Sequence, residues 1–325
     1  MFSPREIFNI DSDTSFERVA LDVFRYQFHG NEIYRNWCKA IGRSMNDVRR
    51  LEDIPFLPIE FFKTHQVISD PVHPQTQVFK SSGTTGSVTS THYVNEVELY
   101  RMSALKGFRK AYGDPSDLVF ICLLPGYLER GDSSLVYMFE YLMQCSSQEE
   151  NGFFLHQEEE LIKRLERVKH SGRHTLLLGV SYALLDLCGK IDLNERFIVM
   201  ETGGMKGKRK EMTKPELHET LKKGLKVQQI HSEYGMTELL SQAYSQGDGC
   251  YHPPPWMRFS VRDVNDPFEH LGYHKTGGLN VIDLANLHSC SFIATKDLAR
   301  LTEKGMEWMG RYDESDIRGC NLLLD

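Results

Sequence analysis

Hydrophobic positions follow two different periods along this sequence, and the two periods alternate through its central part. Continuous apolar runs at 118–124, 175–180 and 197–201 predict strands that are covered on both faces. Between and around these strands, apolar residues spaced by three and four positions predict amphipathic helices. These helices are expected at 96–112, from Ser133 or Ser134 onward, and at 158–169, 182–188 and 214–223. Because strands and helices alternate, the pattern predicts an α/β fold with a largely parallel sheet.

Outside this central part the pattern changes. Helical spacing within 16–51 predicts helices near the N-terminus, whereas beyond residue 250 short strand-like runs appear at 259–262, 278–283 and 291–295. These runs predict a smaller β-rich subdomain. At 325 residues the chain exceeds the size at which single hydrophobic cores usually stop growing, which agrees with a large domain in two parts.

Loops rich in glycine and hydroxyl side chains follow several predicted strands, at the position where parallel sheets bind ligands. They are expected at 80–87, 125–134 and 202–210, and at 231–238 after a short predicted strand at 227–230. The loop at 80–87 is the most distinctive, because its two glycines and the hydroxyl side chains of Ser81, Ser82, Thr84 and Thr85 suit the close approach of phosphate oxygens. It lacks the Lys-Ser/Thr ending of a P-loop, and by itself it is also typical of an ordinary surface turn.

Composition and charge narrow the class of protein. The chain carries 38 basic and 45 acidic residues, a net charge of −7, which argues against a nucleic-acid-binding surface. We expect no signal peptide, and the most apolar helical stretch, 135–143, contains Glu140 and is too short to span a membrane. Seven cysteines without a C-x-x-C pair indicate reduced thiols. The expectation is a cytoplasmic protein.

Four motifs occur in the order and rough spacing of the adenylate-forming enzymes, which include acyl-CoA synthetases, luciferases and peptide-synthetase adenylation domains. They are Ser81-Ser82-Gly83-Thr84-Thr85-Gly86, Tyr234-Gly235-Met236-Thr237-Glu238, Thr295-Lys296-Asp297 and Gly310-Arg311-Tyr312-Asp313. Further motifs make the chain resemble the acyl-protein synthetase (long-chain fatty acid–luciferin component ligase) family. They are Pro125-x-Tyr127-Leu128-Glu129-Arg130, Thr202-Gly203-Gly204-x-Lys206-Gly207 and Arg318-Gly319-Cys320. The resemblance implies an adenylation core at 1–309, with its β-rich part at about 250–309, and a hinge-like C-terminal stub at 310–325.

The resemblance also implies a reaction, its cofactors and the residues that serve it. A carboxylic acid, most naturally a fatty acid, would be activated by ATP and Mg²⁺ to an acyl-adenylate and passed to a thiol. The resemblance implies that the 81–87 loop would hold the β- and γ-phosphates, that Thr237 would donate to the α-phosphate and that Glu238 would bind Mg²⁺. The remaining roles concern the nucleoside: Tyr234 stacks on adenine beside Gly235, Gly203 and Gly204 admit the base, and Asp297 binds the ribose with Arg311 nearby.

The sequence departs from the wider superfamily after the hinge-like Gly310-Arg311. Most adenylate-forming enzymes have about a hundred further residues there, including a lysine that reaches the transferring phosphate, whereas this sequence ends at Asp325. The expectation is therefore a chain without that lid. A second departure is Ser87-Val88-Thr89 after the loop, where many relatives have a basic residue, so another cation is expected to supply the missing positive charge. Lys206 is the preferred candidate, ahead of Lys80 and Arg318.

The thiol acceptor is open at this point. Cys320, next to Arg318 near the end of the chain, is a candidate because a nearby cation favours the reactive thiolate; it could equally be a small apolar residue beside Leu322. The alternatives are transfer to free CoA, or a protein that binds ATP or acyl-adenylate without turnover. An acyl reductase or an acyl carrier is the expected partner.

His92 and His231 are acid–base candidates, although lone histidines are more often structural.

Overall fold

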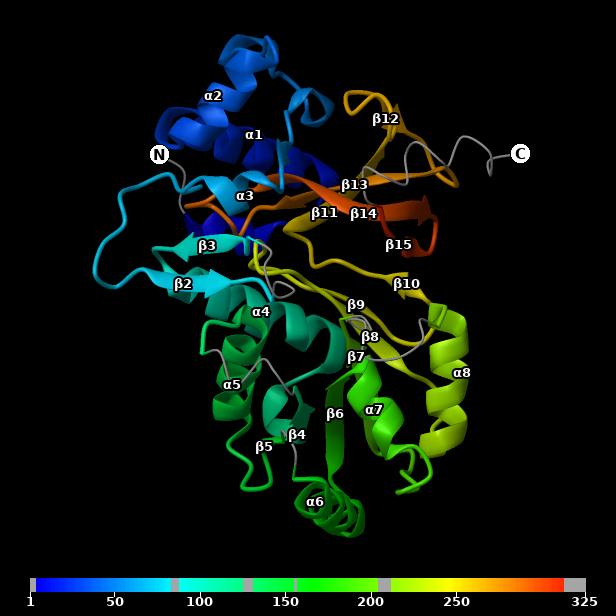
Figure 1. The fold of residues 1–325 in the computed structure, drawn as a ribbon. Helices are drawn as coiled ribbons and strands as arrows, with labels where there is room; N and C mark the ends of the chain where they lie inside the picture. Colours follow the sequence, from blue (N-terminus) through cyan, green and yellow to red (C-terminus); the bar gives the residue numbers. More distant parts are fainter. Residues whose placement is uncertain (1–3, 83–87, 125–130, 155–156, 204–211, 313–325) are drawn as a thin grey trace. The chain divides into compact units, whose positions relative to one another are not determined.

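Two compact units make up the chain in the computed structural model, which describes residues 4–82, 88–124, 131–154, 157–203 and 212–312 (Figure 1). Unit 1 comprises Met1–Ser103, Thr237–Ser241 and Cys250–Asp325, and unit 2 comprises Ala104–Met236 and Gln242–Gly249. The boundary first falls inside helix α4 (Val97–Tyr112). The chain later leaves unit 2 for unit 1 and returns to it within the short segment Thr237–Ser241.

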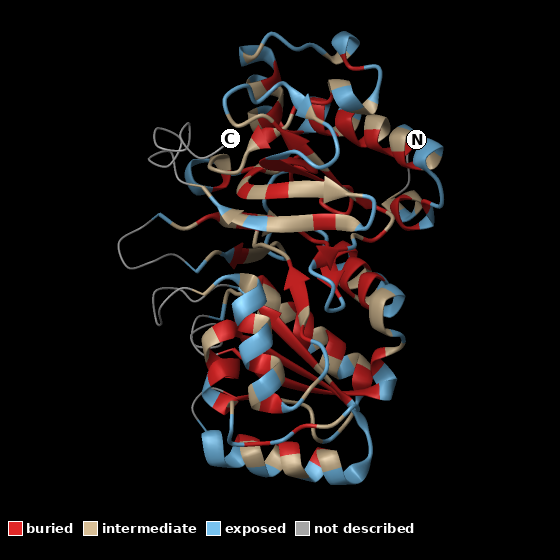
Figure 2. Ribbon diagram, turned by 90° about the vertical axis from the view of Figure 1, so that its right-hand side faces the viewer, coloured by how far each residue is buried: buried red, intermediate tan, exposed pale blue. Residues whose placement is uncertain are grey.

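Unit 2 contains a six-stranded sheet with the strand order β5-β4-β6-β7-β8-β9, parallel except for the last pair. Its strands are β4 (Leu118–Leu123), β5 (Gly152–Phe154), β6 (His174–Val180), β7 (Phe197–Thr202), β8 (His231–Tyr234) and β9 (Ala243–Ser245). Its helices are α5 (Ser134–Ser146), α6 (Glu158–Ser171), α7 (Ser181–Leu187) and α8 (Lys214–Leu225). The strands are largely buried, as Figure 2 shows, because helices cover them. This arrangement confirms the predicted α/β class with a mostly parallel sheet.

One strand of this sheet differs from the sequence expectation. The strand predicted at 227–230 is wrong, because those residues lie outside any strand and β8 occupies 231–234, which was expected to be loop. The sequence of β8, His-Ser-Glu-Tyr, is too polar to read as a buried strand. It is nevertheless buried because Ser232 and Glu233 form side-chain hydrogen bonds with Glu201 and Thr202 of the neighbouring strand β7.

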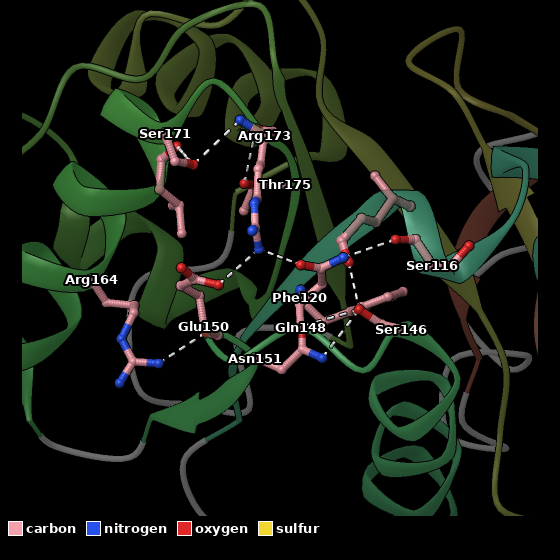
Figure 3. A network of polar contacts seen from close by, with 12 residues as sticks. Ser116, Phe120, Ser146, Gln148, Glu150, Asn151, Arg164, Ser171, Arg173 and Thr175 are labelled. Carbon is pink, nitrogen blue, oxygen red and sulfur yellow. Dashed lines mark hydrogen bonds and ion pairs between the residues drawn. The ribbon is translucent and has the colours of Figure 1, made fainter.

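A network of polar contacts joins the segment before β5 to the amino-terminal ends of β4 and β6 (Figure 3). The Phe120 N–H donates to Asn151 Oδ1 at 2.8 Å, and the Arg173 guanidinium donates to Gln148 and, at 3.1 Å, to Glu150. The network lies at the opposite ends of the strands from those where parallel sheets bind ligands. We therefore assign it to the stability of the sheet.

Unit 1 is built around a seven-stranded sheet with the order β10-β15-β14-β13-β11-β12, to which β1 adds by parallel pairing with β14. Its strands are β1 (Leu57–Pro58), β10 (Cys250–Tyr251), β11 (Met257–Arg262), β12 (His270–Leu271), β13 (Thr276–Asp283), β14 (Phe292–Thr302) and β15 (Gly305–Arg311). The strands along the path pair antiparallel, and they contain the three strand-like runs predicted beyond residue 250. The β-rich character predicted beyond residue 250 is thus confirmed, and this sheet belongs to one unit with the N-terminal segments.

The N-terminal segments of unit 1 supply helices and a separate hairpin. The helices are α1 (Asp13–Gly30), α2 (Glu32–Ala40), α3 (Phe61–Thr64) and the short 3-10 helices at Pro4–Asn9, Met45–Asp47 and Leu51–Asp53, while a fourth 3-10 helix, Pro115–Asp117, belongs to unit 2. The strands β2 (Gln77–Lys80) and β3 (Thr91–Val94) pair antiparallel in a two-stranded sheet. Tyr34 of α2 stacks on Phe292 of β14 with the ring centres 5.9 Å apart, which fixes the helices to the sheet. Within the described ranges, no helix combines the length and apolar character needed to cross a membrane.

Candidate active site

The hydroxyl-rich loop begins and ends at a pair of serines in unit 1. The Ser81 N–H donates to the Ser90 carbonyl at 3.0 Å, and the Ser90 N–H donates to Ser81 Oγ at 2.9 Å. These bonds extend the β2–β3 hairpin by one pair and fix where the loop leaves the sheet. Ser82, the next residue, is exposed. Gly83, Thr84, Thr85 and Gly86 lie outside the described residues, as do the predicted Gly204, Lys206 and Cys320.

The segment Thr237–Ser241, which we call the 237–241 turn, is held in unit 1 through its main chain. At its start, His92 Nδ1 lies 2.8 Å from the Thr237 carbonyl oxygen, and Asn286 Nδ2 donates to the Glu238 carbonyl at 2.7 Å. At its end, the buried Asp283 carboxylate accepts the Leu240 and Ser241 N–H groups at 2.7 and 2.9 Å. Hydrogen bonds from three buried side chains therefore fix the peptide planes of the turn.

Glu238 is the buried carboxylate of this turn, and its surroundings contain the other predicted residues of unit 1. Burial raises the pKa of Glu238, and the charge of Asp297 acts in the same direction. A hydrogen bond with Ser90 and the charge of Arg311 act in the opposite direction. Glu238 thus lies within electrostatic reach of Asp297 and Arg311, although these residues are far away in the sequence.

Asp297 and Arg311 face each other across neighbouring strands. They are register partners on β14 and β15, and Arg311 Nε lies 3.1 Å from Asp297 Oδ1. The Asp297 side chain is only 4% exposed, whereas that of Arg311 is 72% exposed. A buried carboxylate and an exposed guanidinium therefore lie within electrostatic reach of Glu238. Thr237, Glu238, Asp297 and Arg311 are brought together within unit 1.

The predicted nucleoside-binding residues that are described in unit 2 lie at the carboxyl ends of β7 and β8. Beyond the register pair Thr202–Glu233, Gly203 follows the end of β7 and Tyr234 is the last residue of β8. Gly203 has φ of +66°, a conformation that favours glycine. A Cβ added to Gly235 would overlap Glu233 Oε1, so the glycine lets that carboxyl pack over the main chain. This edge is where parallel sheets bind ligands.

Two buried carboxylates at the same edge were missed by the sequence reasoning. Burial alone would raise the pKa of Glu201. The charge of Lys214, at 2.9 Å, and hydrogen bonds from His218 and Ser232 instead lower this pKa to about 2. Burial raises the pKa of Glu233 to about 7, against a hydrogen bond from Thr202. The one available signal was the acidic residue that ends the apolar run 197–200, because a charge at the end of a buried strand requires a partner.

The two histidines considered as acid–base groups have different settings. His92 is fully buried, with both ring nitrogens in contact with oxygens, and burial lowers its pKa to about 4. Burial and the charge of His218 lower the pKa of His231 to about 4, and its Nδ1 lies 3.2 Å from the Tyr112 hydroxyl. Both rings are therefore neutral near pH 7, and their contacts favour structural roles.

Comparisons of sequence point to one family. Residues 3–123 match the family model described as acyl-protein synthetase, LuxE. The long-chain-fatty-acid–luciferin-component ligase of Vibrio harveyi is 23% identical over 333 residues, which cover 94% of this chain and 86% of that protein. The enzyme of the same name from Aliivibrio fischeri is 22% identical over 307 residues, covering 88% of this chain and 79% of that protein.

Solved structures show the same fold. An open conformation of 2-hydroxyisobutyryl-CoA ligase, in complex with 2-HIB-AMP and CoA, is similar with a TM-score of 0.68 at 14% identity, over 93% of this chain and 70% of that chain. ATP-bound MatB from Rhodopseudomonas palustris is similar with a TM-score of 0.54 at 17% identity, over 72% of this chain. The match spans about half of the MatB chain, 47%. The chain is therefore similar in sequence to acyl-protein synthetases, and it shares its fold with 2-hydroxyisobutyryl-CoA ligase and MatB.

Proposed function

We propose that this protein is an ATP-dependent, AMP-forming ligase that activates a fatty acid as its acyl-adenylate and transfers the acyl group to a thiol. The observation that carries the proposal is the convergence of Thr237, Glu238, Asp297 and Arg311 in unit 1. Homology to enzymes named long-chain-fatty-acid–luciferin-component ligases supports the acid substrate.

In the first step a carboxylate oxygen of the acid attacks the α-phosphorus of ATP. The bond between that phosphorus and the oxygen that bridges to the β-phosphorus breaks, and pyrophosphate leaves. Negative charge grows on the α-phosphate oxygens, so donors that are already in place lower the barrier. The Thr237 hydroxyl is the proposed donor, because the main chain that carries it is fixed by His92 and Asn286.

The setting of Glu238 fits a divalent cation. A buried carboxylate whose pKa is raised by burial is stabilised in its ionised form by a nearby cation. In the part of the chain that the structure describes, no three metal-binding side chains converge. One protein carboxylate with phosphate oxygens is the usual arrangement for Mg²⁺, which would neutralise phosphate charge there.

The other predicted residues take the remaining parts of the nucleotide in this proposal. Asp297 accepts hydrogen bonds from the ribose hydroxyls while Arg311 holds its carboxylate. The Ser81–Gly86 loop takes the β- and γ-phosphates, and its described end is fixed by the Ser81–Ser90 pair. In unit 2, Tyr234 takes the adenine ring beside Gly203, Gly204 and Gly235.

The second step transfers the acyl group. A thiolate sulfur attacks the acyl carbonyl carbon, the bond from that carbon to the phosphate oxygen breaks, and AMP leaves. Cys320 is the proposed acceptor, Lys206 the proposed cation near the transferring phosphate, and an acyl reductase or carrier protein the onward partner. Burial raises the pKa of the Cys122 and Cys290 thiols, which makes these two cysteines poor nucleophiles.

The test combines two measurements on the full chain. The protein is incubated with Mg-ATP and C8 to C16 acids, and intact mass and hydroxamate formation are recorded. We expect a thioester-sized mass increase that hydroxylamine removes, that Cys320→Ser abolishes and that the matched control Cys145→Ser retains. If hydroxamate forms but the protein gains no mass, the proposed adenylation stands and Cys320 is excluded as the acyl carrier. Formation of acyl-CoA after CoA is added would then show that CoA is the acceptor. Measurable ATP binding without either product would contradict the proposed enzyme.

A further inference from the structure

The 237–241 turn is positioned by the rest of unit 1. The chain before it, up to Met236, and the chain after it, from Gln242, both belong to unit 2. The turn therefore depends on side chains of unit 1 for its place beside Asp297 and Arg311. Its first two residues, Thr237 and Glu238, are the ones with proposed roles toward the nucleotide.

His92 supplies one of these contacts from a rigid position. It lies on β3, paired in register with Phe79 of β2, and its side chain is completely buried. Its ring meets that of Phe62 edge to face, with the ring centres 5.7 Å apart. The ring therefore has little freedom to turn, and Nδ1 is directed at the Thr237 carbonyl oxygen at 2.8 Å.

Asn286 supplies the second contact, and its orientation follows from its partners. Its Nδ2 donates to the carbonyls of Glu238, at 2.7 Å, and Cys290, at 2.9 Å. Both amide hydrogens are thus used, and Oδ1 is left to accept; it lies 3.0 Å from His92 Nε2. A neutral imidazole has one N–H, so it can donate either to the Thr237 carbonyl or to Asn286 Oδ1.

We propose that His92 is a positioning residue for adenylation, and that its Nδ1–H holds the Thr237 carbonyl so that the Thr237 and Glu238 side chains are directed at the nucleotide. This inference rests on the proposed function. The Thr237 carbonyl belongs to the peptide plane that also contains the Glu238 N–H. The His92 bond to the Thr237 carbonyl and the Asn286 bond to the Glu238 carbonyl therefore fix the peptide planes on both sides of Glu238.

Two substitutions separate the two ring nitrogens. The amide nitrogen of asparagine lies as many bonds from Cβ as Nδ1 does, and that of glutamine lies as many as Nε2 does. His92→Asn therefore retains a donor toward Thr237, whereas His92→Gln retains one toward Asn286. Small misplacements of reacting groups cost up to about 10²-fold in rate.

The experiment measures ATP-dependent hydroxamate formation by wild type and both variants, with kcat and the KM for ATP determined separately. We expect kcat to fall about 10- to 100-fold in His92→Gln and only a few-fold in His92→Asn, with a smaller change in KM, because the proposed contact of Thr237 strengthens in the transition state. Chemical denaturation of both variants accounts for any general loss of stability. Equal losses in the two variants, or a larger loss in His92→Asn, would overturn the proposal.

A second measurement does not require turnover. Hydrogen exchange of the peptide that covers 237–241, followed by mass spectrometry, is expected to accelerate in His92→Gln and to stay near wild type in His92→Asn. Unchanged exchange in His92→Gln would overturn the inference even if the enzyme is active. If wild type forms no hydroxamate, the proposed function fails, and the exchange data still decide whether His92 holds the turn.

Discussion

Two buried polar clusters, one in each unit, hold their parts of the chain by different means. In unit 1, His92, Asp283 and Asn286 bind main-chain atoms of the 237–241 turn. In unit 2, the Glu201 carboxylate binds charged or hydroxyl side chains, among them Lys214 at 2.9 Å and Ser232 at 2.6 Å. The first cluster fixes the backbone that carries Thr237 and Glu238, whereas the second is a set of side chains that satisfy each other.

The carboxylates of the two clusters show the same difference in their pKa values. Burial raises the pKa of Glu238. It also acts to raise the pKa of Glu201, but the charge of Lys214 and the hydrogen bonds to Glu201 together outweigh burial and lower that pKa to about 2. A buried carboxylate with a raised pKa in a cluster of other predicted site residues is a candidate functional group, whereas removing one partner of a buried ion pair is strongly destabilising. Substitutions in the first cluster should therefore change turnover, and those in the second should change stability.

The largest effect is expected for Glu238→Gln, which keeps the shape of the side chain and removes its charge. Loss of one electrostatic contact to the reacting phosphate typically costs about 10²–10³-fold in rate, and hydroxamate formation should fall by that amount. The free energy of unfolding should stay near wild type, because the neutral amide has no buried charge to desolvate. Glu303→Gln, at an exposed pair with His274, is the control for both assays. A loss of stability that matches the loss of activity would contradict this assignment.

The next effect is expected in unit 2 and concerns stability. Glu201→Ala removes one partner of a buried ion pair, which typically costs about 3–5 kcal/mol; because Lys214 is a quarter exposed, we expect about 3 kcal/mol in chemical denaturation. Glu158→Ala breaks the exposed pair with Lys190 and should cost less than about 1 kcal/mol. Similar costs for the two variants would show that the buried ion pair of Glu201 does not stabilise unit 2 more than an exposed pair does.

A smaller effect on stability is expected from Glu233, which also lies in unit 2, and it depends on pH. The pKa of Glu233 is raised from 4.5 to about 7 by burial, so the folded protein holds a proton that the unfolded chain releases between these values. Stability from this group is therefore complete below pH 4.5 and is lost as the pH rises to 7, by up to about 3 kcal/mol at about 1.4 kcal/mol per pKa unit. Unfolding measured across this range should show a smaller decline in Glu233→Gln. Parallel curves for the two proteins would refute this reading.

Motifs in the sequence selected residues that the fold brings within electrostatic reach of one another, but they gave no sign of the contacts that only the fold creates. Glu238, Asp297 and Arg311 were assigned from ordered motifs, and the structure brings them together. The contacts of His92 with Thr237 and Asn286 join residues 145 and 194 positions apart, and no local pattern reports such a pairing. The strand β8 was missed for a related reason, because its polar side chains are satisfied only by the neighbouring strand.

The smallest effect tests why residue 235 is a glycine. A Cβ there would overlap Glu233 Oε1, which lies at the end of a side chain that can move, so Gly235→Ala should cost about 1–3 kcal/mol. In a Glu233→Ala background the overlap is removed, and the added cost of Gly235→Ala should fall; denaturation of the double-mutant cycle measures this coupling. Additive costs would mean that the Glu233 side chain is not the reason for glycine at position 235. If the coupling appears while ATP affinity of Gly235→Ala remains near wild type, the glycine serves the buried carboxyl of unit 2. Reduced ATP affinity in both backgrounds would instead place its role in the approach of the nucleotide.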